Sequence, residues 1–251
     1  MEDTHQESRG RFYVDALPVD DGEFDLPPEE AAHAGGSRRL APGDILTLVD
    51  ASGWELTAEV VSTRGKRLTV VPRGRRFAGP AFRASVKCAT ALPKGAREDI
   101  LVSKCAELGV TSLVPVDFAR SVVKASVHVE KRRARYERLI IEAAKQSGQA
   151  TLTRIEAAID VTSFLCAEKA PVRLFGDPQA SVGVLEVLGG GDFDAVTYLV
   201  GPEGGMTDEE KSLALSHGWT GVRIAPTTLR VETACIAFAA VIATFMGKRS
   251  G

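Results

Sequence analysis

The feature that most constrains the fold is a change of sequence pattern near residue 83. Before it, short apolar and β-branched runs alternate with turns, whereas after it strand-like and helix-like segments alternate to the end of the chain. Strand–helix alternation is typical of an α/β fold whose mostly parallel sheet has helices on both faces. The sequence therefore predicts a disordered tail over residues 1–9 and two domains, residues 10–82 and 83–251.

The first region has the pattern of a small β-barrel. The runs "DILTLVD", "WELTAEVVST" and "RLTVVPRG" predict strands, and glycines punctuate them at regular intervals, at positions Gly43, Gly53, Gly65 and Gly74. "PPEEAAHAGGSRRL" predicts one short helix that begins near its prolines. "GRRFAGPAF" then predicts a linker into the second region.

The second region predicts six strands and four helices. The strands are "ASVKCAT", "TSLVPVD", "TRIEAAI", "VRLFGD", "VTYLVGP" and "GVRIAPTTL". The helices are "AREDILVSKCAELG", "VEKRRARYERLIIEAAKQSG", "TDEEKSLALSHGW" and "TACIAFAAVIATFMG". The first helix is amphipathic, with Ile100, Leu101, Cys105 and Leu108 on one side. In the third, Thr207 and Glu210 have the spacing of a capping box.

Charge is distributed unevenly along a chain whose net charge is only −2. Residues 1–36 hold ten acidic and two basic side chains, whereas residues 37–90 hold ten basic and four acidic ones. Such asymmetry fits a basic face that binds a polyanion, and it fits equally a strand-rich domain with solvated arginines.

Several classes of protein are disfavoured by the sequence. Cys88, Cys105, Cys166 and Cys235 lack paired spacing and histidine neighbours, so we expect no metal site, no disulfide framework and a cytoplasmic protein. The polar start "MEDTHQESRG" does not have the pattern of a signal peptide. No apolar run approaches the roughly 18–20 residues of a membrane span, so no membrane partner is expected.

The stretch "LVGPEGGMTDEE" joins a predicted strand to a predicted helix. Glycine permits positive φ and close backbone approach, and ligands of parallel sheets bind beyond the carboxyl ends of the strands. The phosphate-binding glycine fingerprints are missing, and Glu203 would repel a phosphate. The loop is therefore expected to bind a neutral or cationic part of a ligand, or else to be a tight turn that leads into the helix.

A second unusual stretch, "IAPTTLRVETA", again joins a strand to a helix. It turns at Pro226 and places Arg230 and Glu232 just before a very apolar helix. The two side chains could form a helix cap and an ion pair. Two special loops at neighbouring strand ends also favour a binding site.

These stretches together resemble a known family. "LVGPEGGMTDEE", "LRVETA", "KCAELGV" and "EAAKQSGQ" occur in the order typical of the RsmE family, over about residues 10–247. Its members are SPOUT-class, S-adenosylmethionine-dependent methyltransferases that modify N3 of a uridine in 16S ribosomal RNA of the small subunit. The resemblance implies a PUA-like β-barrel that helps bind RNA, a trefoil-knotted α/β domain and a homodimer with its site at the subunit interface.

The resemblance also implies roles for particular residues. Arg230 would stabilise negative charge on the uracil oxygens, and Glu232 would orient Arg230, help to remove the N3 proton or simply cap the helix. The cofactor-binding residues implied are Leu174, Phe175, Gly176, Val200, Gly201, Pro202, Glu203, Gly204, Gly205, Ile224, Ala225, Pro226, Thr228 and Leu229. The RNA-binding candidates are Arg11, Arg38, Arg39, Lys131, Arg132 and Arg135.

Some positions depart from the family pattern. The family usually has Leu-Gly where this chain has Ile224 and Ala225, an arginine at Gln149 and a glutamate at Asp99. A SPOUT ribose 2′-O-methyltransferase would share the cofactor loops, and a non-catalytic RNA-binding protein could keep the fold. The placement of "LRVETA", the N-terminal barrel and the retention of Arg230 favour the uridine N3-methyltransferase.

Overall fold

The computed structural model of the chain describes residues 8–36, 38–79, 84–189 and 193–246. The chain divides into two compact units. Unit 1 comprises Met1–Ala81 with Ala144–Thr151, and unit 2 comprises Phe82–Ala143 with Leu152–Gly251. The division predicted near residue 82 did not include residues 144–151 in the first unit.

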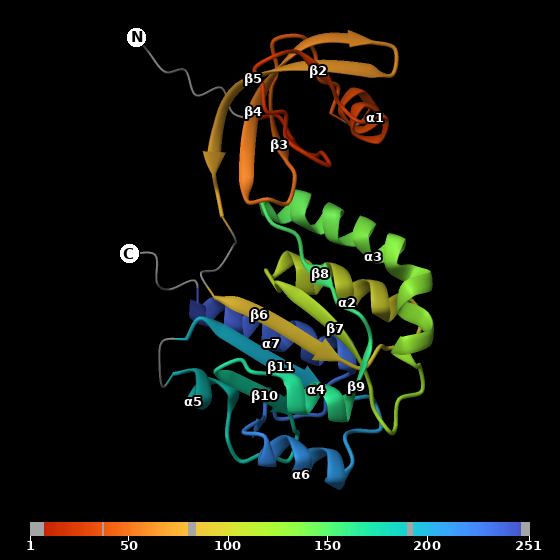
Figure 1. Cartoon of the computed structure of the whole chain (residues 1–251), viewed down its shortest axis with the longest axis vertical. Coiled ribbons are helices and arrows are strands. Elements are labelled where there is room, and N and C mark those ends of the chain that lie inside the picture. Colours follow the sequence, from red (N-terminus) through yellow and green to blue (C-terminus); the bar gives the residue numbers. More distant parts are fainter. Residues whose placement is uncertain (1–7, 37, 80–83, 190–192, 247–251) are drawn as a thin grey trace. The chain divides into compact units, whose positions relative to one another are not determined.

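Unit 1 is built on a five-stranded sheet and one helix (Figure 1). The elements are β1 (Arg11–Tyr13), β2 (Phe24–Asp25), α1 (Pro28–Gly36), β3 (Ile45–Val49), β4 (Trp54–Arg64) and β5 (Arg67–Phe77). The strand order is β1-β3-β4-β5-β2, in which β1 and β3 are parallel and the other pairs are antiparallel.

The β4–β5 hairpin dominates this sheet. Gly65 allows the tight turn with a φ of 61°, and the register shifts twice, between Thr57 and Ala58 and between Val60 and Ser62. Such irregularities bend a sheet, and one apolar core fills its inner side. Because the pairing path ends at β1 and β2, a closed barrel stays a prediction.

Two predictions for this unit were wrong in detail. Gly74–Phe77 of the expected linker belongs to β5, because these residues continue the ladder with β4. The expected tail, residues 1–9, falls mostly outside the described residues. Arg9, however, is held by an ion pair to Asp44 at 2.7 Å and by a backbone bond to the Ile45 carbonyl.

Unit 2 contains one sheet in which every recorded strand pair is parallel. Its strands are β6 (Ser85–Thr90), β7 (Ser112–Asp117), β8 (Arg154–Ile155), β9 (Ile159–Asp160), β10 (Val172–Gly176), β11 (Ala195–Val200) and β12 (Thr220–Val222). The order is β12-β10-β11-β6-β7-β8, and β9 also pairs with β7. The predicted mostly parallel sheet is confirmed.

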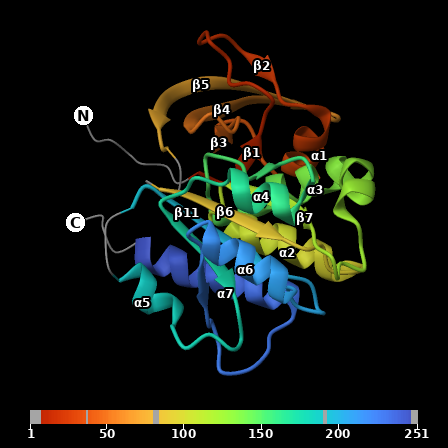
Figure 2. The same ribbon diagram turned by 60° about the horizontal axis from the view of Figure 1, so that its bottom comes forward.

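Helices cover both faces of this sheet (Figures 1 and 2). They are α2 (Ala96–Glu107), α3 (Ala125–Ser147), α4 (Val161–Ala167), α5 (Val184–Leu188), α6 (Asp208–Ser216) and α7 (Val231–Met246). Residues of α2, α3, α5 and α7 share one core, and those of α4 and α6 share the other. Successive strand residues therefore enter opposite cores, as Leu174 and Phe175 do.

The sequence pattern missed several features of unit 2. The expected strand "TRIEAAI" is split into β8 and β9, and α4 and α5 were not predicted. In α2, Ile100 is 45% exposed whereas Glu98 is buried. Glu98 accepts hydrogen bonds from Tyr136 and Arg132 of α3, which explains how an acid can occupy the inner face.

The capping box predicted at the start of α6 is confirmed, and it gives a test of stability. The Thr207 hydroxyl accepts the Glu210 N–H at 3.2 Å, and the Glu210 carboxylate accepts the Thr207 and Ala119 N–H groups. We expect Thr207→Ala to lower the free energy of unfolding by about 1 kcal/mol, measured by urea denaturation. Ser212→Ala, at an exposed position of the same helix, is the control and should change it by less than about 0.5 kcal/mol. Equal effects would contradict the capping role.

Candidate functional site

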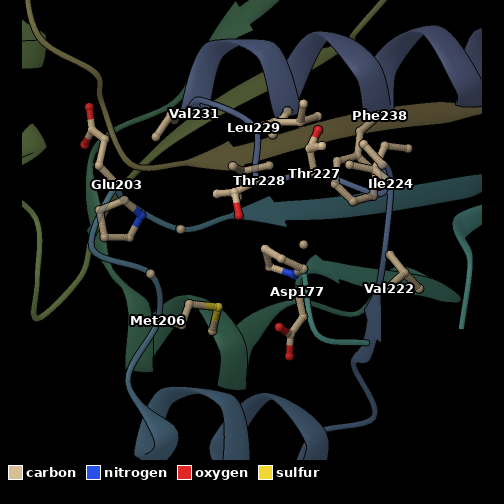
Figure 3. Close-up of a pocket in the computed structure, with 18 residues that line it drawn as sticks. Asp177, Glu203, Met206, Val222, Ile224, Thr227, Thr228, Leu229, Val231 and Phe238 are labelled. Atoms are coloured by element: carbon tan, nitrogen blue, oxygen red, sulfur yellow. The ribbon is translucent and has the colours of Figure 1, made fainter. Parts of the chain in front are cut away.

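The site lies where three neighbouring parallel strands end. β10 ends at Gly176, β11 at Val200 and β12 at Val222, and because the strands are parallel their carboxyl ends lie at one edge of the sheet. The loops that follow them, together with the first turns of α7, surround a single cavity (Figure 3).

The cavity has a volume of about 130 Å³, roughly ten times what one buried water needs. It is therefore large enough for a ligand rather than a packing defect. Its lining is mostly apolar side chains and loop backbone. The lining residues are Gly176, Asp177, Pro178, Val200, Gly201, Pro202, Glu203, Gly205, Met206, Val222, Ile224, Ala225, Thr227, Thr228, Leu229, Val231, Ala234 and Phe238.

Two of the three glycines in the GPEGG loop are required, each for a different reason, and the third is not. A Cβ on Gly201 would lie 3.0 Å from Met206 Cγ, which is closer than side chains pack. Gly204 lies against Arg120, where a Cβ would meet Arg120 Cβ at 3.4 Å. Gly205 has a φ of 71°, which L-residues rarely adopt. The loop thus combines close packing with one left-handed residue. A turn that only connects a strand to a helix would not need both features.

Hydrogen bonds hold the three loops in place. The Gly205 N–H donates to the Pro202 carbonyl at 2.8 Å and closes the GPEGG turn, while Arg120 donates to the Gly204 carbonyl at 3.0 Å. The first and third loops are joined where the Asp177 N–H donates to the Val222 carbonyl at 2.9 Å. The cavity is therefore framed by backbone that is largely preformed.

Two acidic residues line the cavity, and each is paired with a base. The Asp177 carboxylate lines it and pairs with Lys211 at 3.1 Å. Glu203 is exposed, pairs with Arg97 at 3.5 Å, and points away from the middle of the cavity (Figure 3). An apolar lining whose acidic groups are already paired suits a ligand with a flat apolar part better than a phosphate.

The two residues expected to be catalytic lie at the start of α7. The Arg230 carbonyl accepts the Ala234 N–H at 2.8 Å, so the helix begins three residues earlier than its apolar run. The Arg230 side chain is exposed and Glu232 is buried, with Oε2 lacking a hydrogen-bond partner among the described residues. No contact between Arg230 and Glu232 occurs within these residues, so the expected orienting ion pair is not seen.

The structure brings most of the predicted cofactor residues to the cavity, with four exceptions. Leu174 and Phe175 do not line it, because their side chains fill the two cores of the sheet. Gly204 and Pro226 also lie outside the lining, Gly204 against Arg120 and Pro226 exposed to solvent.

Other lining residues were missed by the sequence analysis. Asp177 and Met206 directly follow the two predicted motifs, so their positions offered a signal. Val231, Ala234 and Phe238 recur at the spacing of one helical face, which is the only sign in the sequence that α7 supplies a wall.

The RNA-binding candidates divide into two groups. Arg11 pairs with buried Glu55, and Arg132 and Arg135 pair with Glu98 and Asp99, so these three arginines bind the chain's own acids. Arg38, Arg39 and Lys131 are exposed, and within the described residues they form no ion pair.

The cysteines do not offer a nucleophile at the site. Cys88, Cys105 and Cys235 are buried, and Cys166 is exposed and does not line the cavity. Burial raises the pKa of the Cys88 thiol and of the nearby Tyr198 hydroxyl well above their usual values, so both stay neutral. In the described part of the chain, no cluster of side chains could hold a metal ion, and no helix there is long and apolar enough to cross a bilayer.

Comparison with known proteins decides the family. Residues 81–243 match the family described as RNA methyltransferase domain. The chain belongs to this RNA methyltransferase family. The match covers all three loops of the cavity and most of α7.

Individual relatives agree with this assignment. The ribosomal RNA small subunit methyltransferase E of Mycobacterium tuberculosis is 28% identical over 229 residues, covering 89% of this chain and 87% of the relative. That of Bacillus subtilis is 27% identical and covers 84% and 86%. The resemblance to the RsmE family is therefore confirmed for this RNA methyltransferase.

Solved structures show the same fold over nearly the whole chain. A methyltransferase from Legionella pneumophila in complex with the cofactor SAM has a TM-score of 0.84 at 26% identity, covering 95% of this chain and 98% of its own. Ribosomal RNA small subunit methyltransferase E from Neisseria gonorrhoeae, bound to S-adenosyl methionine, has a TM-score of 0.82 at 27% identity, covering 94% and 97%.

The left-handed backbone at Gly205 gives a direct test of the loop of this RNA methyltransferase. We expect Gly205→Ala to lower the free energy of unfolding by about 1–2 kcal/mol, because a Cβ is strained at positive φ. Gly205→Asn should cost less, since asparagine tolerates this conformation. The matched control is Gly204→Ala, whose added Cβ meets only an ordinary contact. Urea denaturation of the three variants would contradict the assignment if Gly204→Ala were the most destabilised.

Proposed function

We propose that the chain transfers a methyl group from S-adenosyl-L-methionine to N3 of a uridine in 16S ribosomal RNA of the small subunit. The observation that carries this proposal is the position of the GPEGG loop and the LRVETA segment, which line or adjoin one cavity in a member of the RNA methyltransferase family. The names of the relatives and the SAM bound to two similar structures support it.

The cavity residues fit the cofactor. Ile224, Leu229 and Phe238 offer apolar surface for an adenine ring. At Gly176 a Cβ would lie 3.3 Å from the Phe238 ring, so the missing side chain lets this ring stand at the cavity wall. When bound, S-adenosylmethionine supplies a methyl group activated by a sulfonium.

The start of α7 would carry the chemistry of the acceptor. The uracil N3 proton must leave, and negative charge then spreads over the neighbouring carbonyl oxygens. Arg230, exposed beside the lining residue Leu229, would stabilise that charge as it develops. Glu232 Oε2 is a buried acceptor without a donor, and it would receive a donor only when substrate or a second subunit binds.

The proposal extends to the finer features that the resemblance implies. We assign unit 1 as a PUA-like barrel that binds RNA, and unit 2 as a trefoil-knotted SPOUT domain that forms a homodimer. Support for the knot is the position of β12 outside β10 although it follows β11 in the chain. Exposed Arg38, Arg39 and Lys131 would contact the RNA backbone.

Methyl transfer to small ribosomal subunits tests the function. We expect incubation with labelled S-adenosylmethionine to give 3-methyluridine on nucleoside analysis. Arg230→Ala should lower kcat about 10²- to 10³-fold, as loss of a donor to a developing oxyanion does. Arg230→Lys should keep part of kcat, and cofactor affinity by calorimetry should be unchanged in both.

The other outcomes are equally informative. A 2′-O-methyl nucleoside as the product would show that the methyl acceptor is the ribose 2′-oxygen and not N3. No product at all would favour a non-catalytic RNA-binding protein. Wild-type kcat in Arg230→Ala would remove the role assigned to this arginine.

The two groups of basic residues predict different responses to salt and to substitution. Lys131→Ala should make the slope of log Kd against log salt for RNA shallower by about 1, because one phosphate contact is lost. Arg132→Ala should instead lower the free energy of unfolding by about 1–3 kcal/mol, because buried Glu98 loses a donor. RNA affinity at several salt concentrations and urea denaturation measure the two effects. An affinity that does not depend on salt would contradict the backbone contacts.

A further inference from the structure

Unit 1 exposes an aromatic pair at the end of its main hairpin. Trp54 opens β4, Phe77 ends β5, and the two residues are directly opposite in the antiparallel register. Their side chains are 41% and 61% exposed. Their rings meet edge to face, with centroids 5.2 Å apart and planes inclined by 62°. Two large aromatic side chains that face water together are characteristic of a contact surface.

The backbone beneath the pair is fixed. Gly53 has a φ of 89°, and a Cβ there would lie 3.0 Å from the Phe77 ring. Its carbonyl accepts the N–H groups of Ala78 and Gly79 at 2.8 and 3.0 Å, and its own N–H donates to the Ala150 carbonyl at 3.1 Å. The rings are therefore held in place before any partner binds, which lowers the entropy lost on binding.

One arginine lies on the same face of the sheet as the pair. Arg75 lies two residues before Phe77, on the same face of β5, and it donates to the Pro18 carbonyl, a neutral partner that leaves its charge uncompensated. On the opposite face, Arg11 and Arg76 both bind Glu55, so two cations share one anion. Aromatic rings beside an arginine that has a neutral partner complement a nucleic acid strand better than a protein core.

We propose that Trp54 and Phe77 form a stacking platform for an unpaired base of the RNA substrate, with Arg75 beside its phosphates. A base whose N3 is methylated must be unpaired, so the strand around it offers free base faces. The proposal rests on the proposed function, because that function supplies the RNA. It adds a base contact in the unit that does not contain the methyl-donor cavity.

Intrinsic fluorescence tests the platform directly. The chain has two tryptophans, Trp54 and Trp219, and Trp219 is 2% exposed, so a short single-stranded oligouridylate should quench Trp54 selectively. Trp54→Phe should remove the quenching and keep most of the affinity. Phe77→Leu and Trp54→Ala should weaken Kd at least about five-fold, as loss of one stacked base does. Val19→Ala, a fully exposed apolar residue of the same unit, is the matched control and should leave Kd unchanged.

Kinetics on small ribosomal subunits separate the platform from the proposed function. Trp54→Ala should raise KM for the subunits and leave kcat unchanged, with the wild-type unfolding midpoint showing that the fold is intact. An unchanged KM in Trp54→Ala and Phe77→Leu, with normal methyl transfer, would overturn the platform and leave the function standing. Quenching of Trp54 by RNA without any methyl transfer would support the platform and contradict the proposed function. Trp54 fluorescence could also change with protein concentration when no RNA is present. That result would show that the pair is a contact between copies of the chain, and it would also overturn the platform.

Discussion

The shared direction of β10, β11 and β12 is the constraint on which the site depends. Because these strands are parallel neighbours, their exits lie at one edge of the sheet, and loops from three distant parts of the sequence meet there. An antiparallel β11 would send the GPEGG loop to the opposite edge. The helices on both faces serve this arrangement, since two apolar cores keep the strands in register.

Close packing around glycine then shapes the cavity. Gly201 lets Met206 approach the loop, and Gly176 lets the Phe238 ring stand at the wall. In each case a missing side chain positions a large neighbour. The cavity walls are therefore formed by large side chains that pack against the glycines as well as by the loops. This explains why small residues and bulky apolar residues occur together around the cavity.

The sequence predicted the elements and loops of the site better than its walls. Strand–helix alternation and glycine clusters are local signals, so β10 to β12, α6 and the loops after them were recognised. Leu174 and Phe175 were assigned to the cofactor from the family resemblance, and the sequence could not show that they face the two cores, because a strand covered on both faces has no solvent side to mark its orientation. Arg132 and Arg135 looked like a free basic face because their partners, Glu98 and Asp99, lie on another helix. Charge pattern along one helix cannot show pairing across two.

The first turns of α7 belong to the core and to the site at once. Val231, Ala234 and Phe238 line the cavity, and all three also belong to the core on that face of the sheet. Glu232 lies among them with a buried oxygen that has no donor in the described residues, and such an acceptor costs about 1–3 kcal/mol. An acid in the first turn favours the helix dipole by less than this. Folding within the described residues therefore leaves this acceptor without a donor, which is why we propose that the substrate or a second copy of the chain supplies one.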